Sequence, residues 1–213
     1  MSPARFGAAL RRWVVAIGAL AAVTPALAAG PVDTDWPCEQ RKVLEISPGQ
    51  VWSGPPLDEA TAHWEDDAEV AALARRIAAR RTSLDEAKTM IDQFSASAGA
   101  DRNRRLASLA AGMLAIINHD RGSVMAGIER YARRQRALAD KIEAQRQELA
   151  ALPPDDGTPE QQQRRADLQE MQTWDTRIFQ ERARSLTYVC ELPRQLEQRA
   201  FALGRAIASH LDR

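Results

Sequence analysis

The chain has 213 residues and equal numbers of basic and acidic side chains, 29 of each. Without residues 1–29, which contain three arginines and no acidic residue, the net charge is −3 with histidine neutral. A nucleic-acid-binding role is therefore not expected, because it requires a strongly basic face. The remaining ~185 residues are compatible with one domain.

Residues 1–29 have the features of a cleaved secretory signal peptide. Arg5, Arg11 and Arg12 precede an apolar run, and Ala26-Leu27-Ala28 supplies a small-x-small cleavage site. The apolar run, 13–23, is shorter than the about 20 residues that a membrane-spanning helix needs. We therefore expect export to the periplasm and no stable membrane span after cleavage. A retained membrane anchor is the alternative.

Residues 30–57 are expected to form an extended, irregular arm. Five of the eleven prolines lie here, together with Trp36, Trp52 and Cys38. The other cysteine of the chain is Cys190, and in an exported protein such a pair is expected to form a disulfide. Closing so long a loop stabilises the fold by roughly 5 kcal/mol in the chain-entropy model. A redox-active or metal-binding pair is the alternative, which the absence of Cys-x-x-Cys spacing and of a histidine cluster disfavours.

Residues 58–213 are predicted to form the helical domain, which starts with two shorter helices. The first is predicted over 58–81, where Val70, Leu73 and Ile77 recur at helical spacing. The second is predicted over 83–97, because Ser83-Leu84-Asp85-Glu86 matches a capping box. Both helices are expected to pack on the base of a longer structure.

The longer structure is a predicted antiparallel hairpin with arms at about 101–152 and 160–212. Heptad spacing typical of a coiled-coil seam runs along both arms, and the proline-rich turn 153–159 separates them. In the first arm the seam positions are Val124, Ile128, Tyr131, Gln135, Leu138, Ile142, Gln145, Leu149 and Leu152. In the second they are Leu168, Met171, Asp175, Ile178, Arg182, Ser185, Val189, Leu192 and Leu196. The sequence therefore predicts an all-α fold, a long coiled-coil-like hairpin with two shorter helices on its base and an irregular proline-rich arm.

The first arm is predicted to be one continuous helix, because the heptad register is kept across Asn118–Ser123. A break at Asn118-His119-Asp120 is the alternative. In the second arm, Pro193 is expected to kink or locally open the helix.

Antiparallel pairing about the predicted turn places particular side chains opposite one another. Leu138 is expected beside Trp174. Asp175 is expected near Arg134 or Arg136. In a further pairing, Arg182 is expected near Glu129 and Tyr131.

The sequence indicates no catalytic, cofactor-binding or metal-binding residues, and we expect a protein that is not an enzyme. His63, His119 and His210 are far apart, and no glycine-rich phosphate loop is present. The acidic run that follows His63 is interpreted as a solvated helix start, where the helix dipole favours acids.

The leading hypothesis is a periplasmic interaction protein, adaptor-like or chaperone-like, whose hairpin binds a protein partner or another copy of the chain. The alternative is a small-ligand or metal-binding protein, or an enzyme accessory subunit, with a pocket between the N-terminal arm and the helical base.

Overall fold

The computed structural model describes residues 35–154 and 156–212, and in these residues the fold is all-α and contains no strand. The predicted signal peptide lies outside the described residues, as does the start of the arm. In chain order the helices are α1 (Pro48–Val51), α2 (Asp58–His63), α3 (Ala68–Ala78), α4 (Leu84–Ser97), the short 3₁₀ turn η1 (Gly99–Asp101), α5 (Arg102–Ala151) and α6 (Pro159–Ala208).

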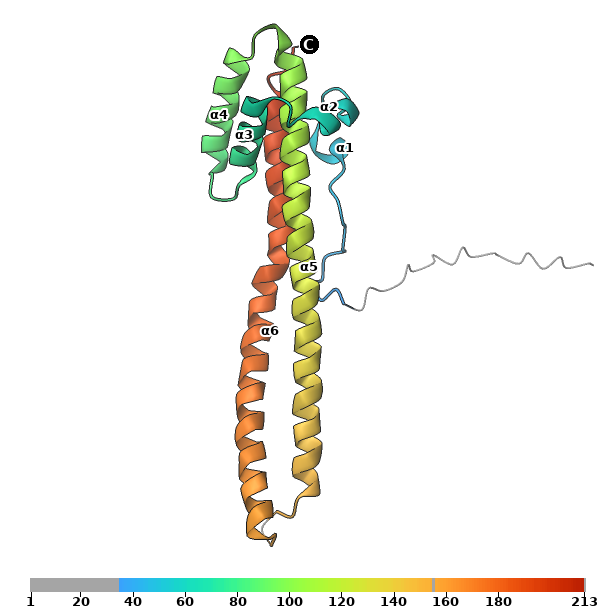
Figure 1. Cartoon of the computed structure of the whole chain (residues 1–213), viewed down its shortest axis with the longest axis vertical. Helices are drawn as coiled ribbons and strands as arrows, with labels where there is room; N and C mark the ends of the chain where they lie inside the picture. The colour runs from blue at the N-terminus through green and yellow to red at the C-terminus, as the bar shows by residue number, and fades with distance from the viewer. Residues whose placement is uncertain (1–34, 155, 213) are drawn as a thin grey trace, which may run out of the picture. The chain divides into compact units, whose positions relative to one another are not determined.

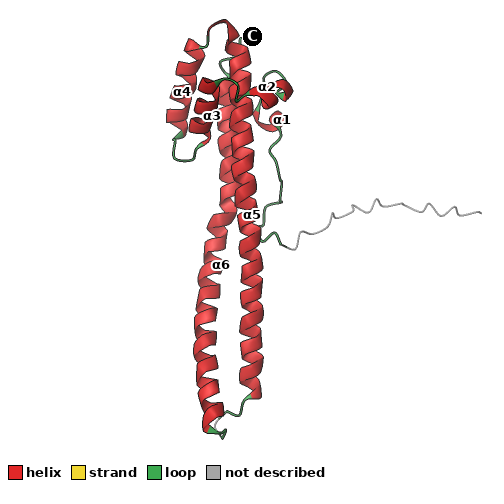
Figure 2. Ribbon diagram, in the orientation of Figure 1, coloured by secondary structure: helices red, strands yellow, loops and turns green. Residues whose placement is uncertain are grey.

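Helices α5 and α6 form the predicted antiparallel hairpin, and the four short helices gather at one end of it (Figure 1). We call this end the base. The remainder is the distal hairpin, defined as the part of α6 before Cys190 and the part of α5 beside it, and it ends at the turn between the two helices (Figure 2). As predicted, α5 is continuous through Asn118–Ser123. Helix α6 also continues through Pro193.

The apolar core lies at the base because the apolar stripe of α5 is broad there and contacts several helices at once. Its fully buried members come from α3, α4, α5 and α6: Val70, Ile77, Ile91, Leu106, Leu109, Met113, Ile117, Leu203 and Ile207. Beyond Ile117 the buried apolar side chains become sparse, and in the distal part of α6 Leu168 is the one fully buried among the described residues.

The helix predicted over 58–81 is wrong in one respect, because the structure divides it into α2 and α3. Asp67 ends the interruption by capping α3, its Oδ1 accepting hydrogen bonds from the backbone N–H groups of Glu69 (3.0 Å) and Val70 (3.2 Å). The interruption also brings Trp64 against α5 at Gly112, where an added Cβ would lie 2.5 Å from the Trp64 ring.

The following helix begins as predicted, with Ser83 Oγ accepting a hydrogen bond from the Glu86 N–H. The second half of the expected capping box is replaced, because the Glu86 carboxylate accepts a hydrogen bond from Arg76 at 3.3 Å. At the other end of the chain, α6 stops at Ala208, a turn earlier than the predicted end at 212.

Arg199 of α6 holds the C-terminal end of α3 in place. Its guanidinium donates hydrogen bonds to the carbonyl oxygens of Ile77, at 2.6 and 3.1 Å, of Ala78 at 3.1 Å and of Thr82 at 2.8 Å. The carbonyls of Ile77 and Ala78 lie in the last turn of α3, where a helix leaves acceptors unpaired, and the positive charge complements the helix dipole. Burial lowers the pKa of Arg199 from its ordinary value, but an arginine remains protonated at neutral pH. The long hairpin is therefore tied to the α3–α4 pair through polar as well as apolar contacts.

Gly204 and Gly122 form a matched pair for testing how closely α1 approaches the hairpin. A Cβ at Gly204 would lie 2.1 Å from the carbonyl oxygen of Val51 in α1, whereas one at Gly122 would meet no atom within 4 Å. We expect Gly204→Ala to lower the free energy of unfolding by about 1–3 kcal/mol through overpacking. Gly122→Ala should raise it by about 0.5–1 kcal/mol, because alanine is the better helix former. Urea unfolding of both variants measures this, and an equal gain in both would show that α1 does not pack here.

Candidate functional site

The structure joins Cys38 and Cys190 in the predicted disulfide, with a Cα–Cα distance of 5.6 Å. The bridge spans 152 positions of sequence and fastens the N-terminal arm to α6 at the boundary between the base and the distal hairpin. Gln40 strengthens this attachment, because its side-chain amide donates a hydrogen bond to the Cys190 carbonyl oxygen.

From the disulfide to α1, the arm lies along α5 with the opposite chain direction. Asn118 pairs with both backbone groups of Ile46, its Oδ1 accepting from the N–H and its Nδ2 donating to the carbonyl, each at 3.0 Å. One turn further along α5, the buried Arg121 donates to the carbonyls of Val43 and Leu44, the latter at 3.1 Å. The side chains of α5 thus supply the backbone partners that a neighbouring strand would supply in a sheet.

Ion pairs continue this attachment towards the start of the described arm. Lys42 pairs with Glu129, and Asp35 contacts both Arg133, at 2.9 Å, and Arg136. Glu129, which was expected near Arg182, thus forms its ion pair with the arm.

The three histidines do not converge. His63 Nδ1 lies 3.0 Å from Asp66 Oδ2, His210 Nε2 lies 2.8 Å from Asp92 Oδ1, and His119 is exposed on α5. Within the described residues, no group of three or more histidine, cysteine or acidic side chains is arranged to hold a metal ion. The described helices also include none with both the length and the apolar character needed to cross a membrane.

A shallow hollow of about 740 Å³ lies between the end of the arm, α2, α3 and the start of α5, where the alternative hypothesis expected a pocket. Two pairs of charged or titratable groups at its wall contact one another, His63 with Asp66 and Arg105 with Asp67. Arg105 Nε lies 2.8 Å from Asp67 Oδ2, and this hydrogen bond holds the pKa of the Asp67 carboxyl below its ordinary value.

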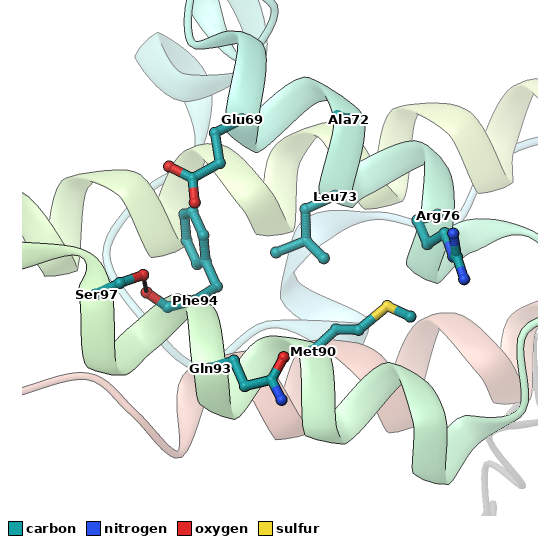
Figure 3. A pocket seen from close by; sticks show the side chains of 8 residues that line it. All are labelled: Glu69, Ala72, Leu73, Arg76, Met90, Gln93, Phe94 and Ser97. Carbon is teal, nitrogen blue, oxygen red and sulfur yellow. Dashed lines mark hydrogen bonds between the residues drawn. The ribbon is translucent and has the colours of Figure 1, made fainter.

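A second hollow, of about 480 Å³, lies between α3 and α4. Figure 3 shows Leu73, Met90 and Phe94 pointing into it, with Glu69 and Arg76 on α3 at its edges. It is open to solvent and lined by both apolar and polar side chains.

The seam of the distal hairpin contains a polar cluster. Asp175 Oδ2 lies 2.8 Å from Lys141 Nζ and accepts a hydrogen bond of 2.8 Å from Gln145 Nε2. The hydrogen bond from Lys141 is the largest cause that lowers the pKa of Asp175. Gln145 is buried, and its Oε1 has no hydrogen-bond partner in the described part of the chain. A buried polar contact of this kind is weak evidence for stability but can fix the register of two helices, and we interpret the cluster in this way.

The predicted partners of Asp175 were therefore wrong, because neither Arg134 nor Arg136 contacts it. Arg136 is turned towards Asp35 of the arm instead. The predicted proximity of Tyr131 and Arg182 is confirmed, although the contact is a 2.7 Å hydrogen bond from the Tyr131 hydroxyl to the Arg182 carbonyl.

The outer face of α6 carries exposed apolar side chains. Met171, Trp174 and Ile178, which we call the α6 strip, are 39%, 56% and 37% exposed. Their spacing of three and four residues places them on one helix face. Tyr188, which is 78% exposed, lies on α6 two residues before the disulfide cysteine Cys190. Large contiguous apolar patches on a protein surface can mark interaction sites, which makes the α6 strip the candidate site.

Trp174 was expected beside Leu138, and the structure turns it to solvent instead. Leu168 and Asp175 occupy the side of α6 that faces α5, and adjacent residues of a helix are about 100° apart. Trp174 is consequently rotated out of the seam, where the guanidinium of Arg177 lies 5.9 Å from the centre of its ring. The position of Trp174 next to Asp175, and not at a seam position itself, is the sequence signal that could have revealed this exposed face.

No protein family, curated protein or solved structure matches the chain.

The pairing between Asn118 and Ile46 yields a prediction for the attachment of the arm. Asn118→Ala leaves the backbone N–H and carbonyl of the buried Ile46 without partners. We expect a loss of about 1–3 kcal/mol in the free energy of unfolding. Asp120→Ala, at an exposed position of the same helix, is the control and should change it by less than about 0.5 kcal/mol. Equal effects in urea unfolding would contradict this role of Asn118.

The lowered pKa of Asp175 predicts a pH-dependent contribution to stability. A carboxyl whose folded-state pKa is depressed stabilises the fold above its ordinary pKa, and this stabilisation is lost as the pH falls through the folded-state value. Asp175→Asn should therefore lower the free energy of unfolding by about 1 kcal/mol at neutral pH. The difference from the unmodified protein should begin to shrink below about pH 4 and close once the pH is below the folded-state pKa. Unfolding measured across this pH range, with Asp140→Asn as an exposed control, tests the prediction, and a difference that persists at low pH would contradict it.

Proposed function

We propose that the protein is an exported, periplasmic interaction module, adaptor-like or chaperone-like, that binds a protein partner through the distal hairpin. A role without catalysis is part of this proposal. The observation that carries it is the α6 strip, in which a tryptophan, a methionine and an isoleucine face solvent on one side of a helix.

Two features support export. Residues 1–29 have the charge and hydropathy pattern of a secretory signal peptide. The disulfide between Cys38 and Cys190 belongs to the chemistry of oxidising compartments, because cytosolic thiols are kept reduced.

The composition of the α6 strip favours a protein partner. Tryptophan and arginine are enriched among the residues that contribute most to protein–protein binding, and here Arg177 stacks on Trp174. An apolar line at spacings of three and four residues is also the pattern that an amphipathic helix presents to a complementary surface. Glu170, Arg177 and Glu181 flank the line and supply charges around an apolar centre.

Trp174 and Phe201 provide a matched test of this proposal. Phe201 is also on α6, is 45% exposed, and carries an arginine over its ring, Arg205 at 4.7 Å, but it lies at the base. In vivo crosslinking with a tagged chain, followed by mass spectrometry, measures partner recovery. We expect Trp174→Ser to reduce recovery at least about tenfold, as removal of a central binding residue does. Phe201→Ser should leave it unchanged.

The proposal fails if the two substitutions reduce recovery equally, or if Trp174→Ser has no effect while both variants remain folded by circular dichroism. A separate measurement tests export, since N-terminal sequencing of the mature protein from the periplasmic fraction should find residues 1–29 removed. An intact N-terminus in that fraction would contradict the signal peptide.

A further inference from the structure

We propose that a second copy of the chain covers the α6 strip, in an antiparallel pairing of the two α6 helices about a two-fold axis between Thr173 and Trp174. This inference rests on the proposed function, because it takes the strip as an interaction surface and names its occupant.

Charge complementarity selects this arrangement. With the axis between Thr173 and Trp174, Glu170 of each copy lies opposite Arg177 of the other, so symmetry produces the pair twice. Glu170 forms no ion pair within the described residues, and Arg177 pairs at 3.0 Å with Glu181 in an exposed contact that is weak enough to be exchanged.

Most of the other charged residues near the strip meet neutral ones in this pairing. Asp167 lies opposite Gln180, Glu181 opposite Ala166, and Arg184 opposite Gln163. Arg182 lies opposite Arg165, but the guanidinium of Arg165 donates to the carbonyls of Leu149 and Leu152 on the side of α6 that faces α5. A parallel pairing would instead place each charged residue beside its own copy, which is unfavourable. The charges of α6 therefore favour the antiparallel arrangement.

The apolar side chains also match. The two Trp174 side chains lie next to the axis and to each other. Ile178 of one copy lies level with Gln169 of the other, two residues from Met171, so the methionine and the isoleucine meet one turn from the axis on both sides. A two-fold interface of this kind is self-complementary, as a homodimer requires.

The length of the free hairpin fits the same axis. Gly157, in the turn at the tip of one copy, lies level with Cys190 of the other. The two distal hairpins thus overlap along their whole length. Each tip stops before Arg199 and Gly204, where the short helices begin to cover α6. If the two-fold axis lay closer to the base, the tip of each copy would collide with these helices. If it lay closer to the tip, part of the strip would stay exposed.

The small size of the strip predicts a reversible dimer. Stable interfaces bury about 800 Å² per partner, whereas the strip offers three large side chains with a few charged neighbours. The dimer should therefore dissociate on dilution.

The test is equilibrium sedimentation of the purified, oxidised, exported chain over about a hundredfold range of concentration, combined with charge reversal. The mass should rise with concentration from that of one chain towards that of two. Glu170→Arg and Arg177→Glu should each weaken association at least about tenfold, because each places like charges opposite one another. The double variant should restore association, since the pair is re-formed with its charges exchanged. Circular dichroism shows whether the helices are retained in each variant.

A single-chain mass at every concentration overturns this inference, and so does a double variant that associates no better than the single ones. These outcomes are distinguishable from failure of the proposed function. If the purified chain is monomeric while partner recovery from cells still depends on Trp174, the dimer is refuted and the interaction module stands.

Discussion

The structure depends on a mismatch of length between the helices. Helices α5 and α6 have 50 residues each, but the helices packed on them are short and lie at one end. Where α3 and α4 add their apolar faces, the hairpin buries a broad core. Beyond that region, two helices alone bury only a narrow seam, because each contacts a single partner. Everything that distinguishes the distal hairpin, including its polar cluster and its exposed apolar face, follows from this loss of partners.

The N-terminal arm is held in place by contacts from other elements. A proline-rich segment cannot form its own regular backbone hydrogen bonds, and its position depends on contacts supplied by other elements. Asn118 and Arg121 supply them from α5, and Arg199 does the same for the end of α3. Because these side chains bind backbone groups, they fix where the bound segment lies but do not depend on which residues that segment contains. The disulfide lowers the conformational entropy of the unfolded chain by closing a long loop. It also holds the arm near α5, where the weak contacts of the arm can form.

Sequence patterns predicted the features that depend on local chemistry or on repetition. The two long helices, their turn and the capping of α4 by Ser83 follow from spacing and propensity, and the disulfide follows from there being two cysteines in a chain with a signal-like N-terminus. The break before α3 was missed because it depends on Trp64 reaching Gly112, a contact between distant segments. The partner of Asp175 was missed because Arg136 is drawn away by Asp35 of the arm. Exposure of Trp174 was missed for a geometric reason. Heptad spacing marks two lines of positions on α6, and the structure encloses the line of Leu168 and Asp175 and leaves the line of Met171 and Ile178 at the edge.

Which of these two lines of α6 is enclosed affects both the stability of the hairpin and the side chains that it exposes. In the distal hairpin the enclosed line holds Asp175 against Lys141 and Gln145, whereas larger apolar side chains are exposed on the same helix. For an isolated chain the reverse arrangement would be more stable, because burying apolar side chains is favourable and burying an amide with an unpaired oxygen is costly. A polar cluster of this kind can fix how two helices are rotated about their axes, and we interpret it in this way. That rotation determines which side chains α6 exposes. Met171, Trp174 and Ile178 are therefore exposed on one side of the hairpin and not buried inside it.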